Sequence, residues 1–186
     1  MKKSLIALSM GLAASLAGTT AFANPGHIDF EGMITSSTCP IDVVNPGDGS
    51  IGNLVKMVSV EASRFTSTGQ EYGGKDFNLR VKGGTGCVLD PVNPNVAKVT
   101  FTGRPAGTAD EFYQVTPTTD GAKGVAIALR DRLSGALLSP GVESDEYPLF
   151  ADRPTDLEFT ATYRSILPAV TAGPASARIG FSVAVN

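Results

Sequence analysis

The sequence predicts an all-β fold, an antiparallel sandwich built as one domain. Three observations predict it. Apolar and polar residues alternate along most of the chain, as they do in strands that bury one face. Turn-forming clusters separate the alternating segments, and the chain of 186 residues contains 21 glycines and 12 prolines. Residues 54–65 are the one stretch that could form a helix, but their β-branched valines indicate a strand with a following turn equally well.

The first residues have the features of a secretion signal. Lys2 and Lys3 precede an apolar stretch, and residues 21–23 have the small-x-small pattern that signal peptidase recognises. We therefore expect residues 1–23 to be a signal peptide that is removed during export. The remaining chain has the length of a single domain and lacks an apolar run long enough to cross a membrane.

Five segments of the exported chain show the period-two pattern of half-buried strands. They are residues 28–34, 77–81, 125–129, 157–163 and 177–185, and residues 41–44 are also strand-like. Between them lie turn clusters at 45–49, 73–74, 83–86, 90–95, 103–107 and 139–141. Many short strands in one domain favour two packed antiparallel sheets.

The cysteine content agrees with export. Cys39 and Cys87 are the two cysteines of the chain, and an even pair in an oxidising compartment is most simply a disulfide. Closing a loop of this length stabilises a fold by about 3–4 kcal/mol in the chain-entropy model. The two thiols and the single histidine, His27, are too few ligands for a metal site. We expect no metal and no cofactor.

The charged residues and the short motifs exclude several functions. With 15 basic and 18 acidic residues, the chain lacks the basic footprint of a nucleic-acid binder. Residues 47–52 have the spacing of a dinucleotide-binding loop, but no convincing helix follows, so a hairpin loop is the better interpretation. His27 lies too close to the expected mature N-terminus to act as a rigid general base, which leaves no histidine for a hydrolase triad.

Two groups of carboxylates are the remaining candidates for catalysis. Paired acids hydrolyse glycosides when an apolar pocket raises the pKa of one of them. Both groups lie near turn residues, and we interpret them as solvated loops rather than as a catalytic site for a small-molecule substrate. They are Glu143, Asp145 and Glu146, and Asp152, Asp156 and Glu158.

The two ends of the exported chain are its most informative parts. The alternating strand 28–34 precedes the first cysteine and is suited to adding to the edge of another sheet, with Ile28, Phe30 and Ile34 entering pockets. Gly32 would let the two backbones approach closely. The alternative is an ordinary edge strand of the chain's own sandwich, and alternation alone favours that alternative.

Six motifs in a fixed order resemble those of chaperone–usher pilins, the major subunits of type 1-like fimbriae. They are Phe30-x-Gly32-x-Ile34 followed by Cys39, the second cysteine at Cys87, Gly-Val-Ala-Ile-Ala-Leu at 124–129, Leu-Glu-Phe-Thr-Ala-Thr-Tyr at 157–163, Gly173 at the fourteenth position from the end, and the alternating strand 177–185. The resemblance covers residues 24–186. It departs from the family at Val185, because an aromatic residue usually stands next to last.

The resemblance implies an incomplete immunoglobulin-like antiparallel sandwich, completed by a donor strand from another subunit or from a periplasmic chaperone. Residues 24–38 would be the donor-strand extension and residues 39–186 the pilin domain. The inserting positions of the extension would be Ile28, Phe30, Gly32 and Ile34. The last strand would line the acceptor groove and bind the chaperone, at positions Gly173, Ala177, Ile179, Phe181, Val183 and Val185.

The function that the resemblance implies is that of a structural subunit and not of an enzyme. Subunits would polymerise by donor-strand exchange at an outer-membrane usher, after export through the periplasm, into the rod of a cell-surface fimbria that supports adhesion. Three alternatives stay open: a minor adaptor subunit of the same system, a self-contained periplasmic β-sandwich that binds a carbohydrate or a protein, and a secreted hydrolase.

Overall fold

The computed structural model describes residues 27–32, 39–45, 49–83, 87, 89–90 and 92–185, and for residues 27–32 it describes the backbone. The expected signal peptide, residues 1–23, and the donor position Ile34 lie outside these ranges. The described residues include no helix with the length and apolar character needed to span a bilayer. The elements are β1 (His27–Gly32), β2 (Ile41–Val44), β3 (Leu54–Lys56), the 3-10 helix η1 (Ala62–Arg64), β4 (Glu71–Val81), β5 (Val96–Thr102), β6 (Pro105–Ala106), β7 (Phe112–Gln114), β8 (Val125–Asp131), β9 (Tyr147–Pro148), β10 (Thr155–Ser165) and β11 (Ala177–Val185).

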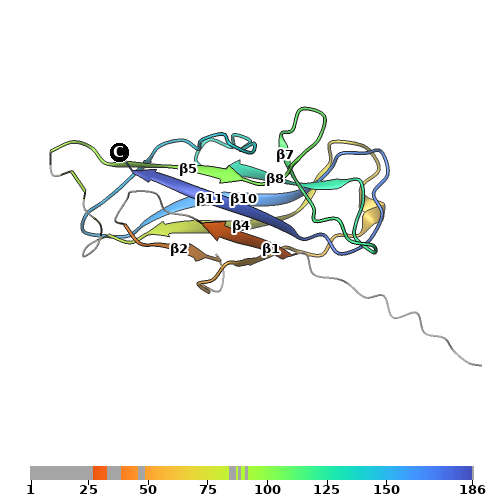
Figure 1. Ribbon diagram of the computed structural model, residues 1–186, viewed down its shortest axis with the longest axis horizontal. Coiled ribbons are helices and arrows are strands. Elements are labelled where there is room, and N and C mark those ends of the chain that lie inside the picture. The colour runs from red at the N-terminus through yellow and green to blue at the C-terminus, as the bar shows by residue number, and fades with distance from the viewer. Residues whose placement is uncertain are drawn as a thin grey trace, which may run out of the picture.

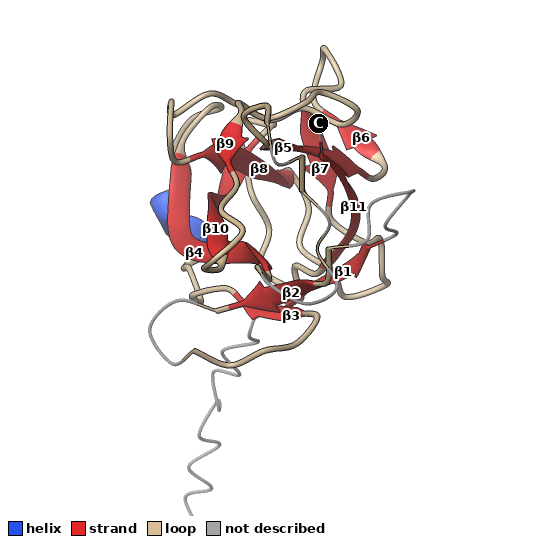
Figure 2. Ribbon diagram, turned by 90° about the vertical axis from the view of Figure 1, so that its left-hand side faces the viewer, coloured by secondary structure: helices blue, strands red, loops and turns tan. Residues whose placement is uncertain are grey.

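Two sheets face each other and form a sandwich (Figures 1 and 2). The first sheet has the strand order β3-β1-β11-β5-β9, and the second has the order β2-β4-β10-β8-β7-β6. Within the described residues, every pairing between named strands is antiparallel except that of β1 with β11. The all-β sandwich that the sequence predicts is therefore confirmed.

Aromatic residues fill the centre of the sandwich. Phe77 of β4, Phe101 of β5 and Phe159 of β10 are fully buried. The ring centroids of Phe101 and Phe159 lie 5.0 Å apart in an edge-to-face arrangement, and those of Phe77 and Phe159 lie 5.7 Å apart. The contact between Phe101 and Phe159 joins the two sheets, because β5 belongs to one sheet and β10 to the other, while Phe77 and Phe159 lie on paired strands of the same sheet.

Three segments of the structure differ from the sequence prediction or decide between its alternatives. β4 contains Gly73 and Gly74, so the turn predicted there is wrong. Gly73 has a φ of 71° and lies where the register between β4 and β10 shifts, so the pair forms a bulge inside a continuous strand. Residues 54–65 form β3 and then η1, which confirms the strand-with-turn alternative. β5 has an alternating sequence that the sequence prediction omits.

The two cysteines form the expected disulfide. Cys39 precedes β2 and is bonded to Cys87, which follows β4, so the bond links the ends of two paired strands. The residues that flank the glycine-rich loop after β2 pair as in a hairpin. Val44 pairs with Ile51 in an antiparallel bridge, as expected for the hairpin interpretation rather than for a dinucleotide site.

Asp131, at the end of β8, is a fully buried carboxylate. It accepts hydrogen bonds from the Tyr147 hydroxyl at 2.7 Å, from the backbone N–H of Leu133 at 2.8 Å and from that of Asp145 at 3.2 Å. These bonds hold the two turns that follow β8 against the end of the sandwich. Removing the carboxylate would leave several donors desolvated without their acceptor.

We expect Asp131→Ala to lower the free energy of unfolding by about 3 kcal/mol, because buried donors lose a charged acceptor. Asp156→Ala is the matched control. The ion pair of Asp156 with Arg80, at 2.6 Å, is partly exposed and should be worth less than about 1 kcal/mol. Chemical denaturation of the mature chain measures both losses, and equal losses would contradict the structural role given to Asp131.

Candidate functional site

β1 fills the position between β3 and β11, which we call the seam (Figure 2). It pairs in parallel with β11, where residues 28–32 lie opposite residues 177–181, and antiparallel with β3. The other edge of β11 is paired with β5. Without β1, the facing edges of β3 and β11 would present unpaired N–H and C=O groups. In this conformation the N-terminal strand therefore completes its own domain, as an inner strand rather than an edge strand.

The strands beside the seam turn apolar residues to the core. Val55 of β3 is fully buried. Burial alternates along β11, so that its inward residues are Ala177, Ile179, Phe181 and Val183. Val185 is partly buried and packs against the same core. These are the positions that the resemblance to pilins assigns to a groove strand. A strand in the seam with apolar residues at alternate positions would extend the same inner surface.

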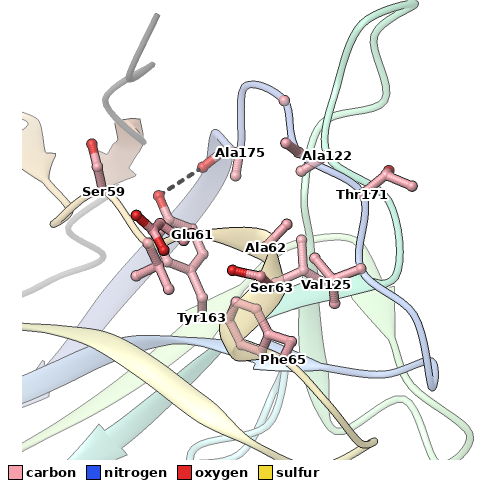
Figure 3. Close-up of a pocket in the computed structure, with 14 residues that line it drawn as sticks. Ser59, Glu61, Ala62, Ser63, Phe65, Ala122, Val125, Tyr163, Thr171 and Ala175 are labelled. Carbon is pink, nitrogen blue, oxygen red and sulfur yellow. Dashed lines mark hydrogen bonds between the residues drawn. The ribbon is translucent and has the colours of Figure 1, made fainter. Parts of the chain in front are cut away.

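The seam ends in an open pocket of about 640 Å³ (Figure 3). The pocket lies beyond the end of β3 and before the start of β11, between two wall segments that belong to residues 59–65 and 170–175. Tyr163 of β10 and Val125 of β8 line it from the opposite sheet. The lining is mainly apolar, with Glu61 as its one ionisable carboxylate among the described residues. An apolar side chain that emerges from the seam at this end would therefore find an open site.

The first wall, residues 59–65, rests on the bulge in β4. A Cβ atom at Gly73 would lie 2.6 Å from Cγ2 of Val60, so only glycine lets the wall come this close. Phe65 is buried and its ring meets that of Tyr72 edge to face, with centroids 5.1 Å apart. Gly73, which interrupts the pattern of β4, thus fixes one side of the pocket.

The second wall continues to the start of β11, and we call residues 170–176 the strap. The backbone N–H of Thr171 donates to the carbonyl of Lys123 at 3.0 Å, and the N–H of Ala122 donates to the carbonyl of Pro174 at 2.9 Å. A Cβ atom at Gly173 would overlap the carbonyl oxygen of Asp120 and lie 2.6 Å from the nitrogen of Ala122. The close backbone approach explains in physical terms why glycine stands at position 173.

Tyr163 joins the strap to the opposite sheet. Its hydroxyl donates to the carbonyl oxygen of Ala175 at 3.2 Å across the pocket (Figure 3). Burial raises the pKa of Tyr163 to about 12. The hydroxyl therefore keeps its proton, and with it this bond, throughout the neutral and mildly alkaline range.

Buried tyrosines should make the fold sensitive to strong alkali. Burial also raises the pKa values of Tyr113 and Tyr147, and hydrogen bonding to Asp131 adds to the effect at Tyr147. The pKa of a tyrosine in an unfolded chain is about 10. Above that pH the unfolded state loses protons that the folded state keeps, so the free energy of unfolding falls by about 1.4 kcal/mol per pH unit for each such tyrosine.

We expect the denaturation midpoint to be steady from about pH 7 to pH 9 and to fall above about pH 10. Tyr163→Phe should make this fall shallower, because one of the ionising groups is absent. The control is Tyr72→Phe, at a partly exposed ring outside that set. Identical slopes for the wild type and Tyr163→Phe would contradict the burial of this hydroxyl as the cause.

Four of the six carboxylates that the sequence offers for hydrolysis take part in partly exposed ion pairs: Glu143, Glu146, Asp156 and Glu158. Lys98 lies 3.1 Å from Glu146 and 3.8 Å from Glu143. A hydrogen bond from Arg80 lowers the pKa of Asp156, whereas a general acid needs a raised pKa. At Asp156 the direction of the pKa shift is therefore opposite to the one that a general acid requires. The described residues contain no group of three metal-ligating side chains.

The structure brings the predicted end segments together but adds a feature that the sequence did not predict. Ile28, Phe30 and Gly32 lie in β1 beside β11, and Gly173 lies in the strap. The pocket residues Val60, Phe65, Val125 and Tyr163 were not singled out. The sequence signals that could have indicated the pocket are two glycines. Gly73 and Gly173 stand where a wall of the pocket lies too close to another segment for a side chain to fit.

Comparison with known proteins places these features in a family. The model of the family described as "Fimbrial protein" matches residues 28–186. The probable major fimbrial subunit LpfA of Escherichia coli O157:H7 is 30% identical over 189 residues, which cover 98% of this chain and 96% of that protein. The K99 fimbrial protein of Escherichia coli is 34% identical over 97 residues, which cover 52% of this chain and 48% of that protein.

Solved structures have the same fold. A type I fimbria protein of Burkholderia pseudomallei is 30% identical with a TM-score of 0.50, and the match covers 87% of this chain and 95% of that one. The P pilus rod subunit PapA gives a TM-score of 0.59 at 19% identity, covering 81% of this chain and all of that one (100%). The family model covers both the strand in the seam and the rest of the sandwich. LpfA matches this chain over nearly the full length of both proteins. The chain belongs to the fimbrial protein family, and it is a structural subunit of a fimbria.

Proposed function

We propose that the chain assembles into a fimbrial rod by donor-strand exchange, in which residues 28–34 of one subunit replace β1 in the seam of the next. The observation that carries the proposal is the place of β1. It comes first in the folded chain, before the disulfide and every other element, and yet it lies between two strands of the sheet. A terminal segment in an interior position can be exchanged between copies without unfolding the elements that follow.

The direction of β1 supports exchange. Parallel pairing is slightly less stable per residue than antiparallel pairing. β1 runs parallel to β11 when it folds back on its own domain, whereas a strand that arrives from another subunit can enter in the opposite direction. Reversed entry would make the pairing with β11 antiparallel and the pairing with β3 parallel. Because β1 pairs with five residues of β11 and with three of β3, the longer register gains the stronger pairing, and this difference favours the polymer over the closed monomer.

Antiparallel entry also gives the pocket an occupant. In that direction, residues later in the donor strand lie opposite residues earlier in β11. The residues after Gly32 would then lie beside the strap, where the seam ends in the pocket. We assign the pocket to Ile34 of the incoming strand, an apolar side chain at the alternate position that follows Gly32. The contact is head to tail, so it extends into an open filament.

The proposal includes the export route and the division of the chain. Residues 1–23 would direct secretion, residues 24–38 would be the donor extension and residues 39–186 the pilin domain. A periplasmic chaperone would protect the seam by lending its own strand, and an outer-membrane usher would exchange that strand for the next subunit's. The acceptor strand would be the one that contains Ala177, Ile179, Phe181, Val183 and Val185.

The test is electron microscopy and denaturing gels of cells that express the chain with its chaperone and usher. We expect filaments, and ladders of oligomers that persist in detergent. Phe30→Asp should reduce the ladder at least about tenfold, because position 30 pairs with the buried Ile179 and burying a charge there is costly. Thr108→Asp, in an exposed turn, is the matched control. Folded monomer without any ladder would instead favour the self-contained β-sandwich, for which the closed position of β1 is the supporting observation.

A further inference from the structure

The strands on either side of the seam carry basic charge on their solvent face. Lys56 is the one charged residue of β3, and Arg178 is the one charged residue of β11. Both are exposed, while the residues next to them, Val55 and Ala177, are buried in the core. Two cations therefore flank the seam in a chain whose net charge is −3.

The strand that fills the seam carries the opposite charge. In β1, Asp29 and Glu31 alternate with the apolar positions Ile28 and Phe30. Asp29 pairs with Arg178 in the register between β1 and β11. Glu31 is two residues further along, so its position is diagonal to the same arginine.

The register with β3 brings in the second cation. Asp29 pairs with Leu54, which places Lys56 on the diagonal from Asp29. Directly opposite and diagonal neighbours on one face of a sheet interact, and opposite charges there are favourable. The backbone register thus places acidic and basic positions beside each other three times along β1 and its two neighbours.

The charge pattern does not depend on the direction in which a strand enters. Whichever way it runs, a strand that turns its apolar positions to the core presents the intervening positions to solvent. Asp29 and Glu31 of a second copy would therefore lie on the face that carries Lys56 and Arg178. The same charges serve the closed monomer and the contact between subunits.

We propose that Lys56 and Arg178 select the incoming donor strand by its outward acidic residues. The inference rests on the proposed function and states which donor strand the seam prefers. Its partner is a second copy of this chain, whose donor strand carries Asp29 and Glu31 at alternate positions. Charges of this kind act mainly on encounter rate and on the choice of partner, and salt weakens them.

The experiment compares two labelled peptides on the mature chain. One has the sequence of residues 24–35, and the other carries Asp29→Lys and Glu31→Lys. Because both peptides compete with the same β1, the ratio of their capture rates cancels the effect of the closed conformation. The measurement is made at about pH 8, where histidine is neutral, and at low salt.

We expect the native peptide to be captured about tenfold faster than the reversed peptide. On the acceptor with Lys56→Glu and Arg178→Glu the preference should invert, and about 1 M salt should reduce it on either acceptor. Arg104→Glu, the same charge change at an exposed residue between β5 and β6, is the control and should leave the preference unchanged.

The outcomes separate the two proposals. Capture of both peptides at equal rates on every acceptor would overturn charge selection while leaving donor-strand exchange in place. An inversion that also appears with Arg104→Glu would overturn the role of Lys56 and Arg178, since overall charge would explain it. Capture of neither peptide on any acceptor would overturn donor-strand exchange itself, and charge selection with it.

Discussion

Deletion of residues 24–35 from the mature chain is expected to leave no stable folded monomer. β1 pairs along both of its edges, with β3 and with β11. Its loss therefore exposes the facing edges of β3 and β11 and the apolar core residues beside them. The expected loss in the free energy of unfolding is about 5 kcal/mol or more, which is comparable to the whole stability of a typical domain. Circular dichroism during urea denaturation measures it, with the disulfide intact in both chains.

A peptide of residues 24–35 added to the deleted chain should restore cooperative unfolding, because it supplies the missing strand from outside. The control peptide carries Ile28→Asp and Phe30→Asp at the positions that pair with Ala177 and Ile179, and it should restore nothing. The deleted chain should also fail to extend a polymer. A cooperative monomer of residues 39–186 at near wild-type stability, or detergent-resistant ladders made by the deleted chain, would show that β1 is neither the completing strand nor the donor.

Gly173→Ala is expected to reduce donor-strand capture by roughly a hundredfold, through the shape of the pocket. The added methyl group would overlap the carbonyl oxygen of Asp120 and the nitrogen of Ala122. Both are backbone atoms in segments that hydrogen bonds fasten together, so no side chain can move aside. The strap has to shift, which displaces one wall of the pocket and the carbonyl of Ala175 that the hydroxyl of Tyr163 binds.

Gly52→Ala is the matched control for this prediction. A Cβ atom at Gly52 would meet nothing within 4 Å, and no positive φ requires glycine there. Capture of a peptide of residues 24–35 measures the effect on the groove, and urea denaturation measures the effect on the sandwich. Wild-type capture by Gly173→Ala would contradict the role of the strap in forming the pocket, and equal losses in the two glycine variants would show a general effect of substitution.

Strands that bury one face were predictable because their pattern is local. β11 occupies residues 177–185 as predicted, and the predicted cores of β8 and β10 lie inside the observed strands. The disulfide between Cys39 and Cys87 was predictable for a different reason, since two cysteines in an exported chain have one another as their only partner. β5 buries alternate residues in the same way, although the sequence prediction does not include a strand there.

Contacts between distant segments were not predictable from the same pattern. Gly73 and Gly74 indicate a turn when only their neighbours are considered, but β10 holds them inside β4 as a bulge. The pocket needs four separate stretches of the chain to meet, and no period in any one stretch encodes their meeting. Glycine at position 173 could be noticed from the sequence, whereas its reason, the backbone of residues 120–122 beside it, appears only in the fold.

The sequence by itself determined that this chain is an all-β domain with one disulfide, through local alternation, turn clusters and an even number of cysteines. The donor role of its first strand is what the resemblance to pilins implies, and it stays a prediction. The tertiary structure decided where that strand lies. It runs parallel to β11, between β3 and β11, in a seam that ends in an open pocket. The physical reason is that an alternating strand specifies which of its faces is buried, while its partner and its direction depend on which backbone edges are left unpaired by the rest of the fold.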